Sequence, residues 1–202
     1  MLMNMKCVLM IAIGILLCPS AQVFAGDWDD ALAFYESGDY KTAHEKMKVL
    51  ADRGNSPAQF TLGVMYENGQ GVSRDFMESA KWYKSAADKG FAEAQYNLGG
   101  MYLKGKGVLQ DNREAMKWYR LAAEQGHNMA QNNLGGMYFE GKGAIQDLVQ
   151  AHFWANLAVI NGNANALKGR EMIEAKMTPE QISEANRLAN EWLEKHKKPT
   201  PP

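Results

Sequence analysis

Cysteine is nearly absent from this sequence, and both cysteines lie close to its N-terminus. Of the 202 residues only two are cysteine, Cys7 and Cys18. The rest of the chain therefore has neither a disulfide framework nor a thiolate metal site. Neither sign of charge is in excess, because 22 lysines and arginines face 23 aspartates and glutamates. Nucleic-acid binding usually requires a basic patch, so this composition argues against it.

Long apolar runs are also absent beyond the N-terminal segment. Lys6 precedes an apolar run over residues 7–17, and small Ala25 stands just before Gly26. A positive start, a short apolar run and a small residue at the cut are typical of a secretory signal peptide. We therefore predict that residues 1–25 are a signal peptide and that the product is exported, either periplasmic or secreted. Loss of Lys6 leaves 21 basic against 23 acidic residues.

What the sequence does contain is one unit of 36 residues written three times. Its Leu-Gly pair occurs at Leu62-Gly63, Leu98-Gly99 and Leu134-Gly135. The same spacing relates the other recurring positions, which are Tyr66, Tyr102 and Tyr138; Gly69 and Gly71, Gly105 and Gly107, Gly141 and Gly143; Asp75, Asp111 and Asp147; Trp82, Trp118 and Trp154; and Gly90, Gly126 and Gly162. A fixed period of about 20 to 50 residues indicates a solenoid.

Each copy predicts a pair of helices. In the middle copy, apolar residues at helical spacing predict a first helix over about residues 92–103. Gly105 and Gly107 then end it, because two glycines in three residues do not propagate a helix. A second helix begins at Asp111 and closes at Gly126. Neither helix can bury its apolar stripe alone, so each pair must stack on the next.

Three recurring positions have a predicted structural role. The aspartates at 75, 111 and 147 are each followed three residues later by Glu or Gln, which predicts three capping boxes. Gly99 and Gly135 lie on the apolar face of the first helices, where a missing side chain lets a neighbouring helix approach. Trp118 and its equivalents recur in every copy, so we assign them to the core.

The repeats have irregular flanks. Residues 27–54 read as a degenerate opening repeat with a first helix over 27–38, before full repeats at 55–90, 91–126 and 127–162. Thr178-Pro179-Glu180-Gln181 is a helix start with a capping box. We therefore predict capping helices within 163–195, a repeat domain over 26–195 and a flexible tail at 196–202.

The middle copy carries a recognisable motif. It consists of Ala94, Leu98, Gly99, Met101, Tyr102, Gly105, Gly107, Val108, Asp111, Trp118, Tyr119, Ala122, Ala123 and Gly126. With it the chain resembles the Sel-one-like repeat family, a relative of the tetratricopeptide repeats, although Ala144 and Ala155 depart from the motif in the third copy. The resemblance implies an all-α fold, a right-handed α/α superhelical solenoid with a C-terminal capping helix. It also implies an adaptor that binds other proteins and is not an enzyme.

The sequence has no motif that predicts a catalytic or metal site. The glycine loops suggest phosphate binding, but no strand precedes them and their middle residue changes from Gln70 to Lys106. The four histidines show no metal-ligand spacing. We expect no catalytic residues, no metal and no cofactor. The alternative that remains open is an envelope enzyme, or a binder of a small ligand such as a cell-wall fragment, that uses the concave groove.

Positions that differ between the copies are free for recognition. If the first helices line the concave surface, the predicted partner-binding residues are Phe60, Val64, Glu67, Glu93, Tyr96, Leu103, Lys104, Met129, Asn132, Phe139 and Glu140. This mixture of aromatic, aliphatic and charged groups is typical of a protein interface. The competing interpretation is that about half of them pack between helices. We expect a protein or peptide partner, no nucleic acid, no integral membrane anchor and a monomeric chain.

Overall fold

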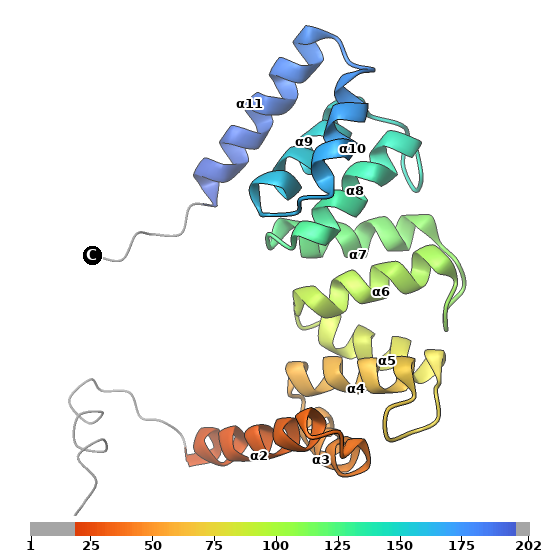
Figure 1. Ribbon diagram of the computed structural model, residues 1–202, viewed down its shortest axis with the longest axis vertical. Coiled ribbons are helices and arrows are strands. Elements are labelled where there is room, and N and C mark those ends of the chain that lie inside the picture. The colour runs from red at the N-terminus through yellow and green to blue at the C-terminus, as the bar shows by residue number, and fades with distance from the viewer. Residues whose placement is uncertain (1–18, 197–202) are drawn as a thin grey trace, which may run out of the picture.

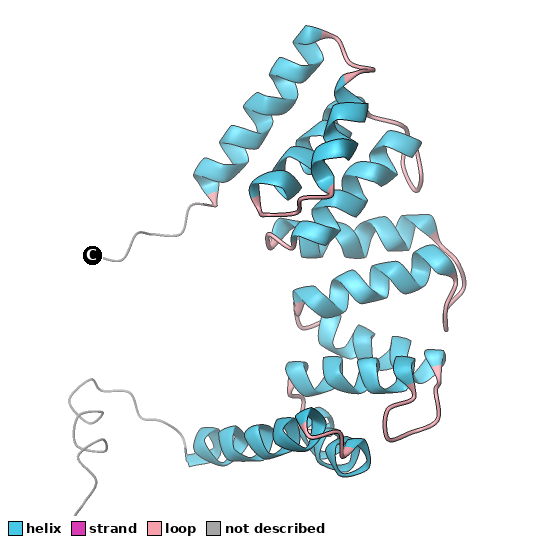
Figure 2. Ribbon diagram, in the orientation of Figure 1, coloured by secondary structure: helices cyan, strands magenta, loops and turns pink. Residues whose placement is uncertain are grey.

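The structure is a computed structural model that describes residues 19–196, with side chains from residue 26 onward. Within this span the chain forms ten α-helices and no strand (Figure 2). They are α2 Pro19–Glu36, α3 Tyr40–Asp52, α4 Ser56–Asn68, α5 Phe76–Ala87, α6 Ala92–Lys104, α7 Asn112–Glu124, α8 Asn128–Glu140, α9 Leu148–Ile160, α10 Ala166–Glu174 and α11 Pro179–Lys195. The predicted all-α class is confirmed.

The helices stack in chain order into an arc (Figure 1). Each helix from α3 to α9 packs on the helices that precede and follow it, as expected for a solenoid whose repeats contact only their neighbours. The order changes at the C-terminal end, where α11 packs on α9. Three apolar clusters follow one another along the arc and form its core.

The first helix is longer than predicted. It was expected over residues 27–38, but α2 begins at Pro19 and ends at Glu36. Proline is favoured in the first helical turn, and no further proline follows it within the helix. The predicted cleavage point after Ala25 therefore falls inside α2. Residues 1–18 of the predicted signal peptide, and the predicted tail apart from His196, lie outside the described residues.

The glycine of each Leu-Gly pair lies at a close contact between the two helices of a repeat. A Cβ at Gly99 would lie 2.9 Å from the Tyr119 ring and 3.2 Å from the carbonyl oxygen of Ala115. At Gly135 it would lie 3.0 Å from the carbonyl oxygen of Ala151. Such distances leave no room for a side chain, so the predicted packing role of both glycines is confirmed.

We expect Gly99→Val to destabilise the protein by about 1–3 kcal/mol, because the added methyl groups overpack the α6–α7 contact. Gly100 is the matched control, since its Cβ would meet only the Tyr119 hydroxyl, at 3.5 Å. Gly100→Ala should stabilise by up to about 1 kcal/mol, through higher helix propensity. Thermal unfolding followed by circular dichroism measures both. Equal melting temperatures for the two variants would contradict the close-packing role of Gly99.

The recurring tryptophans join one repeat to the next. Trp118 on α7 is only 6% exposed and packs in a cluster with Tyr83 of α5 and Leu98 of α6. Trp82 lies in the cluster formed by α2, α3 and α4 in the same way. Their burial confirms the predicted core role.

The predicted capping boxes at the three aspartates are wrong. Each aspartate does cap its helix: the Asp111 carboxylate accepts hydrogen bonds from the backbone N–H groups of Arg113 and Glu114. The backbone N–H of Asp111, however, donates to the Tyr102 carbonyl at 3.0 Å, so it is not free for the Glu114 side chain. Glu114 pairs with Lys117 instead. The predicted capping box at Thr178 is complete.

The glycine loops do more than end a helix. Gly105 has a φ of +66° at the C-cap of α6, which confirms the predicted helix end. Gly107, with a φ of +67°, lies against the Phe76 carbonyl at the start of α5, where a Cβ would clash. Gly71 and Gly143 make the same approach to the starts of α3 and α7. Each loop therefore packs against the preceding repeat, at the start of that repeat's second helix.

Candidate functional site

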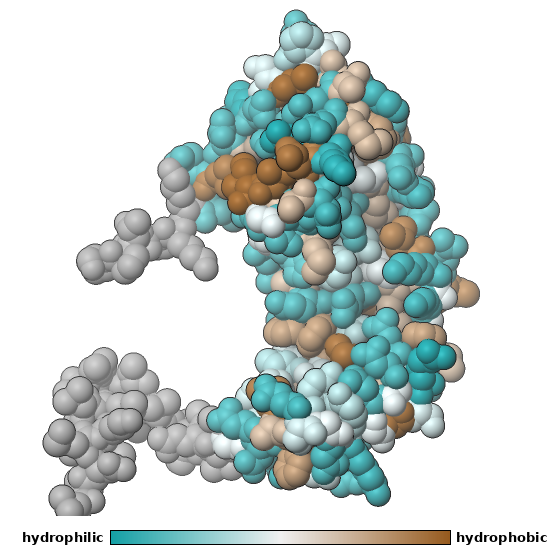
Figure 3. All heavy atoms as spheres, viewed as in Figure 1, coloured by the Kyte–Doolittle hydropathy of each residue, from teal (hydrophilic) through white to brown (hydrophobic). Residues whose placement is uncertain are grey.

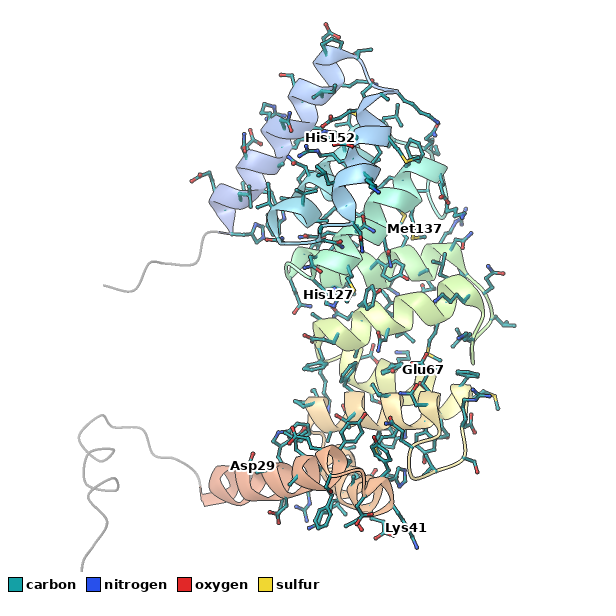
Figure 4. All side chains as sticks on the ribbon, viewed as in Figure 1. Asp29, Lys41, Glu67, His127, Met137 and His152 are labelled. Carbon is teal, nitrogen blue, oxygen red and sulfur yellow. The ribbon has the colours of Figure 1, made fainter. Side chains whose placement is uncertain are left out.

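A groove of about 700 Å³ lies across the first helices of the repeats. Most of its residues belong to α6 and α8, with contributions from α4, α7 and the loops that follow α6 and α8. Figure 4 labels Glu67 and Met137, which belong to its lining. In Figure 3 the surface over α4 to α8 is mostly hydrophilic or neutral, whereas the largest hydrophobic area lies over the C-terminal helices.

Amides, cations and two helical glycines dominate the lining. The amide side chains are those of Asn97, Gln110, Asn112, Asn132 and Asn133, and the charged ones are those of Lys104, Lys106, Lys142, Glu67 and Glu140. The apolar and aromatic side chains are those of Tyr96, Met101, Leu103, Tyr119 and Met137, beside Gly100 and Gly136. The groove thus offers many hydrogen-bonding groups beside apolar and aromatic side chains.

The structure brings together part of the set predicted from the sequence. The predicted residues that line the groove are Glu67, Tyr96, Leu103, Lys104, Asn132 and Glu140. Phe60 and Val64 pack against the cluster of α5 and α6 instead. Phe139 packs against the C-terminal cluster, with the Lys176 ammonium over its ring. Glu93 and Met129 are exposed outside the lining. A binding role for these residues stays a prediction.

Sequence reasoning missed the two asparagines that precede the Leu-Gly pairs. Asn97 lies beside the Tyr83 hydroxyl and Asn133 beside the Tyr119 hydroxyl. Their recurrence in two copies at the repeat spacing was the available signal. Both asparagines line the groove.

Two buried tyrosines, Tyr83 and Tyr119, lie next to residues of the groove. The Tyr83 hydroxyl donates to a Glu67 carboxylate oxygen at 2.8 Å. Burial raises the pKa of Tyr83 far above its ordinary value, and the adjacent Glu67 carboxylate raises it further. Burial likewise raises the pKa of Tyr119 to about 12. Both phenols therefore remain protonated at neutral pH.

Tyr96 and His127 form an aromatic stack at one edge of the groove. Their ring centroids lie 4.7 Å apart with planes inclined by 21°, and the other side of Tyr96 packs on Tyr119. His127 is also the N-cap of α8, because its Nδ1 accepts the backbone N–H of Ala130 at 3.3 Å. Burial lowers the pKa of His127, an effect only partly offset by the charge of Glu93.

This cap makes stability depend on pH. The folded state favours neutral His127, so between its lowered pKa and the ordinary value of about 6.5 the unfolded state binds more protons. The stabilisation that neutral His127 gives the folded state is complete above pH ~6.5 and is lost as the pH falls through the pKa of His127 in the folded state. We expect His127→Asn to remove this pH dependence, because Asn55 caps α4 at the equivalent position without titrating.

The measurement is the free energy of unfolding in urea at about pH 7.5 and pH 5 for both proteins. His44, whose pKa burial also lowers, is common to the two, so its contribution cancels in the difference. An equal loss of stability in both would show that His127 does not carry the effect.

Chemistry beyond binding has little support in the described residues. No group of three His, Cys, Asp or Glu side chains within this part of the chain is placed to hold a metal ion. His152, labelled in Figure 4, approaches Glu174 to 2.7 Å, and because the His152 side chain is only 1% exposed, this pair joins α9 to α10. None of the described helices is long and apolar enough to cross a membrane.

Stacked helix pairs with a groove across their first helices define a helical repeat protein that offers an extended binding surface. A family model for the Sel1 repeat matches residues 56–91, 92–127 and 128–163, together more than half of the chain. The chain belongs to the Sel1 repeat family, as the resemblance predicted. Sel1 repeat proteins are generally protein-interaction scaffolds and typically not enzymes.

Two solved structures are similar to this chain. A Sel1 repeat protein from Oxalobacter formigenes has 29% identity and a TM-score of 0.70, over 83% of this chain and 70% of that one. The protein c5321, described as a protective antigen present in uropathogenic Escherichia coli strains and displaying an SLR fold, has 29% identity and a TM-score of 0.58. That match covers 80% of this chain and 45% of c5321. A search of curated proteins gave no match.

Proposed function

We propose that this chain is a non-catalytic adaptor of the cell envelope, which binds a segment of a partner polypeptide in the groove across α6 and α8. The observation that carries the proposal is the groove itself, formed by amides and lysines around two open glycines. Its volume of about 700 Å³ lies within the range of about 300–1,000 Å³ that is common for ligand pockets.

The two glycines of the groove differ from those of the Leu-Gly pairs. A Cβ at Gly136 would meet nothing within 4 Å, and one at Gly100 would meet only a tyrosine hydroxyl. Glycine inside a helix is less favourable than alanine by about 1 kcal/mol, and the first copy has Val64 at this position. Packing therefore does not explain these glycines. They are explained by an open groove floor, which lets the backbone of a ligand come close.

The amides match the chemistry of a polypeptide. Each Asn or Gln side chain carries both a donor and an acceptor, as does each non-proline residue of a peptide backbone. Asn132 stands where the other copies have Phe60 and Tyr96, so the scaffold does not require an amide there. An extended segment bound along α6 and α8 would find partners for its backbone groups.

Affinity capture from envelope extracts tests the adaptor role. We expect Gly136→Leu to lose the captured polypeptide, because the new side chain enters the groove, while its melting temperature is unchanged or higher. Gly169→Leu is the matched control, since Gly169 lies in α10 outside the groove and its Cβ would also meet nothing within 4 Å. It should capture as well as the unaltered protein.

Two results would overturn this assignment. Equal capture by Gly136→Leu would place recognition on another surface. A soluble metabolite that co-purifies without any polypeptide would favour the small-ligand alternative.

The proposed location rests on Lys6, the apolar run over 7–17 and Ala25. We expect intact-mass measurement of the protein from the extracytoplasmic fraction to give a chain that begins at Gly26. A full-length chain confined to the cytoplasm would contradict export. The signal sequence replaced by a bare initiator methionine is the control, and should leave the protein inside the cell.

A further inference from the structure

The repeats differ in whether the charged side chains of the groove have a partner of opposite charge. The difference lies at two positions of each repeat, the last residue of the first helix and the middle residue of the glycine loop. The first copy has neutral Asn68 and Gln70 there. The third has Glu140 and Lys142, which form an ion pair at 2.5 Å and cancel each other.

The middle copy has two lysines at these positions. No hydrogen bond or ion pair joins Lys104 to another described residue, and Lys106 contacts the Phe76 ring, with its Nζ 5.1 Å from the ring centroid. The remaining carboxylate of the lining, on Glu67, already accepts the Tyr83 hydroxyl. The middle of the groove therefore has two cations without carboxylate partners, in a chain whose net charge is −1.

Local structure explains only part of this arrangement. Lys104 lies in the last turn of α6, where a cation complements the negative end of the helix. Lys106 follows the Gly105 C-cap and lies beyond that turn, and α4 and α8 end without a basic residue in their last turn. The repeat therefore does not require a lysine at position 104, and the first copy has Gln70 in place of Lys106, so it does not require that lysine either.

We propose that the groove selects extended polypeptide segments that carry acidic side chains, with Lys104 and Lys106 pairing with the carboxylates and the amides of Asn97 and Asn132 binding the backbone. This inference rests on the proposed function and adds the chemical class of the partner. Complementary charge steers encounter and sets specificity, which suits a groove whose lining carries three lysines and five amide side chains.

Fluorescence anisotropy with labelled octapeptides tests the selection. The probes alternate serine with glutamate, with glutamine or with lysine, and a thymidine octanucleotide serves as a non-peptide polyanion. We expect the glutamate peptide to bind the unaltered protein about tenfold more tightly than the glutamine peptide at low salt. The preference should weaken as salt screens the lysines.

Removing the charges of Lys104 and Lys106 tests whether these two lysines cause the preference for the glutamate peptide. In Lys104→Gln/Lys106→Gln the glutamate and glutamine peptides should bind equally, with affinity for the glutamine peptide unchanged. Lys168→Gln, an exposed lysine on α10 outside the groove, should retain the tenfold preference. Melting temperatures establish that the variants are folded.

The outcomes separate the two proposals. Equal binding of the glutamate and glutamine peptides to the unaltered protein, abolished for both by Gly136→Leu, would overturn the acidic selection and leave the groove as a polypeptide site. Binding of neither peptide would overturn the acidic selection, and the capture experiment then decides the adaptor role separately. If the oligonucleotide bound as tightly as the glutamate peptide, the acidic selection would also be overturned, because the groove would then attract any polyanion.

Discussion

The close contact at the glycine of each Leu-Gly pair is the constraint on which this structure depends. Without a side chain at Gly99, α6 can lie directly against the Tyr119 ring and the Ala115 backbone of α7. Leu98 beside it is then fully enclosed. Because the pair is held this closely, Trp118 packs against Tyr83 of the preceding repeat, and the two repeats share an apolar cluster. A bulkier residue would change the crossing of the two helices and the placement of every later repeat.

Buried amides reinforce the contact between successive repeats. The Gln95 side chain donates to the Ala87 carbonyl at the end of α5, and Gln59 and Gln131 make the equivalent bonds to Ala51 and Ala123. A buried helix-end carbonyl without a partner would be destabilising, so each glutamine both satisfies the preceding helix and fixes the first helix of its own repeat against it. The register between α6 and α8, and with it the shape of the groove, follows from these contacts.

α6 and α8 each contain two adjacent glycines, and the two have different roles. Gly99 and Gly135 are enclosed by a neighbouring helix, whereas Gly100 and Gly136 face the groove. The lysines divide in a similar way, since Lys142 is neutralised by Glu140 while Lys104 has no carboxylate partner among the described residues. Adjacent residues of one helix turn therefore have different surroundings, one packed against the next helix and the other open to the groove.

The sequence by itself determined the repeat, the helix pairs, the packing glycines and the buried tryptophans, because each recurs at a fixed spacing and depends on local helix geometry. Only the tertiary structure decided which variable positions meet. Phe60 and Phe139 have the composition of an interface but pack into the clusters beside them, since helical spacing gives a residue's face and not its neighbours. The aspartate caps likewise combine a local contact that the sequence predicts with a longer-range contact that it does not. Asp111 caps α7 through local bonds that the sequence predicts, while its backbone N–H is taken by Tyr102, nine residues away, through a loop closure that no local pattern reveals.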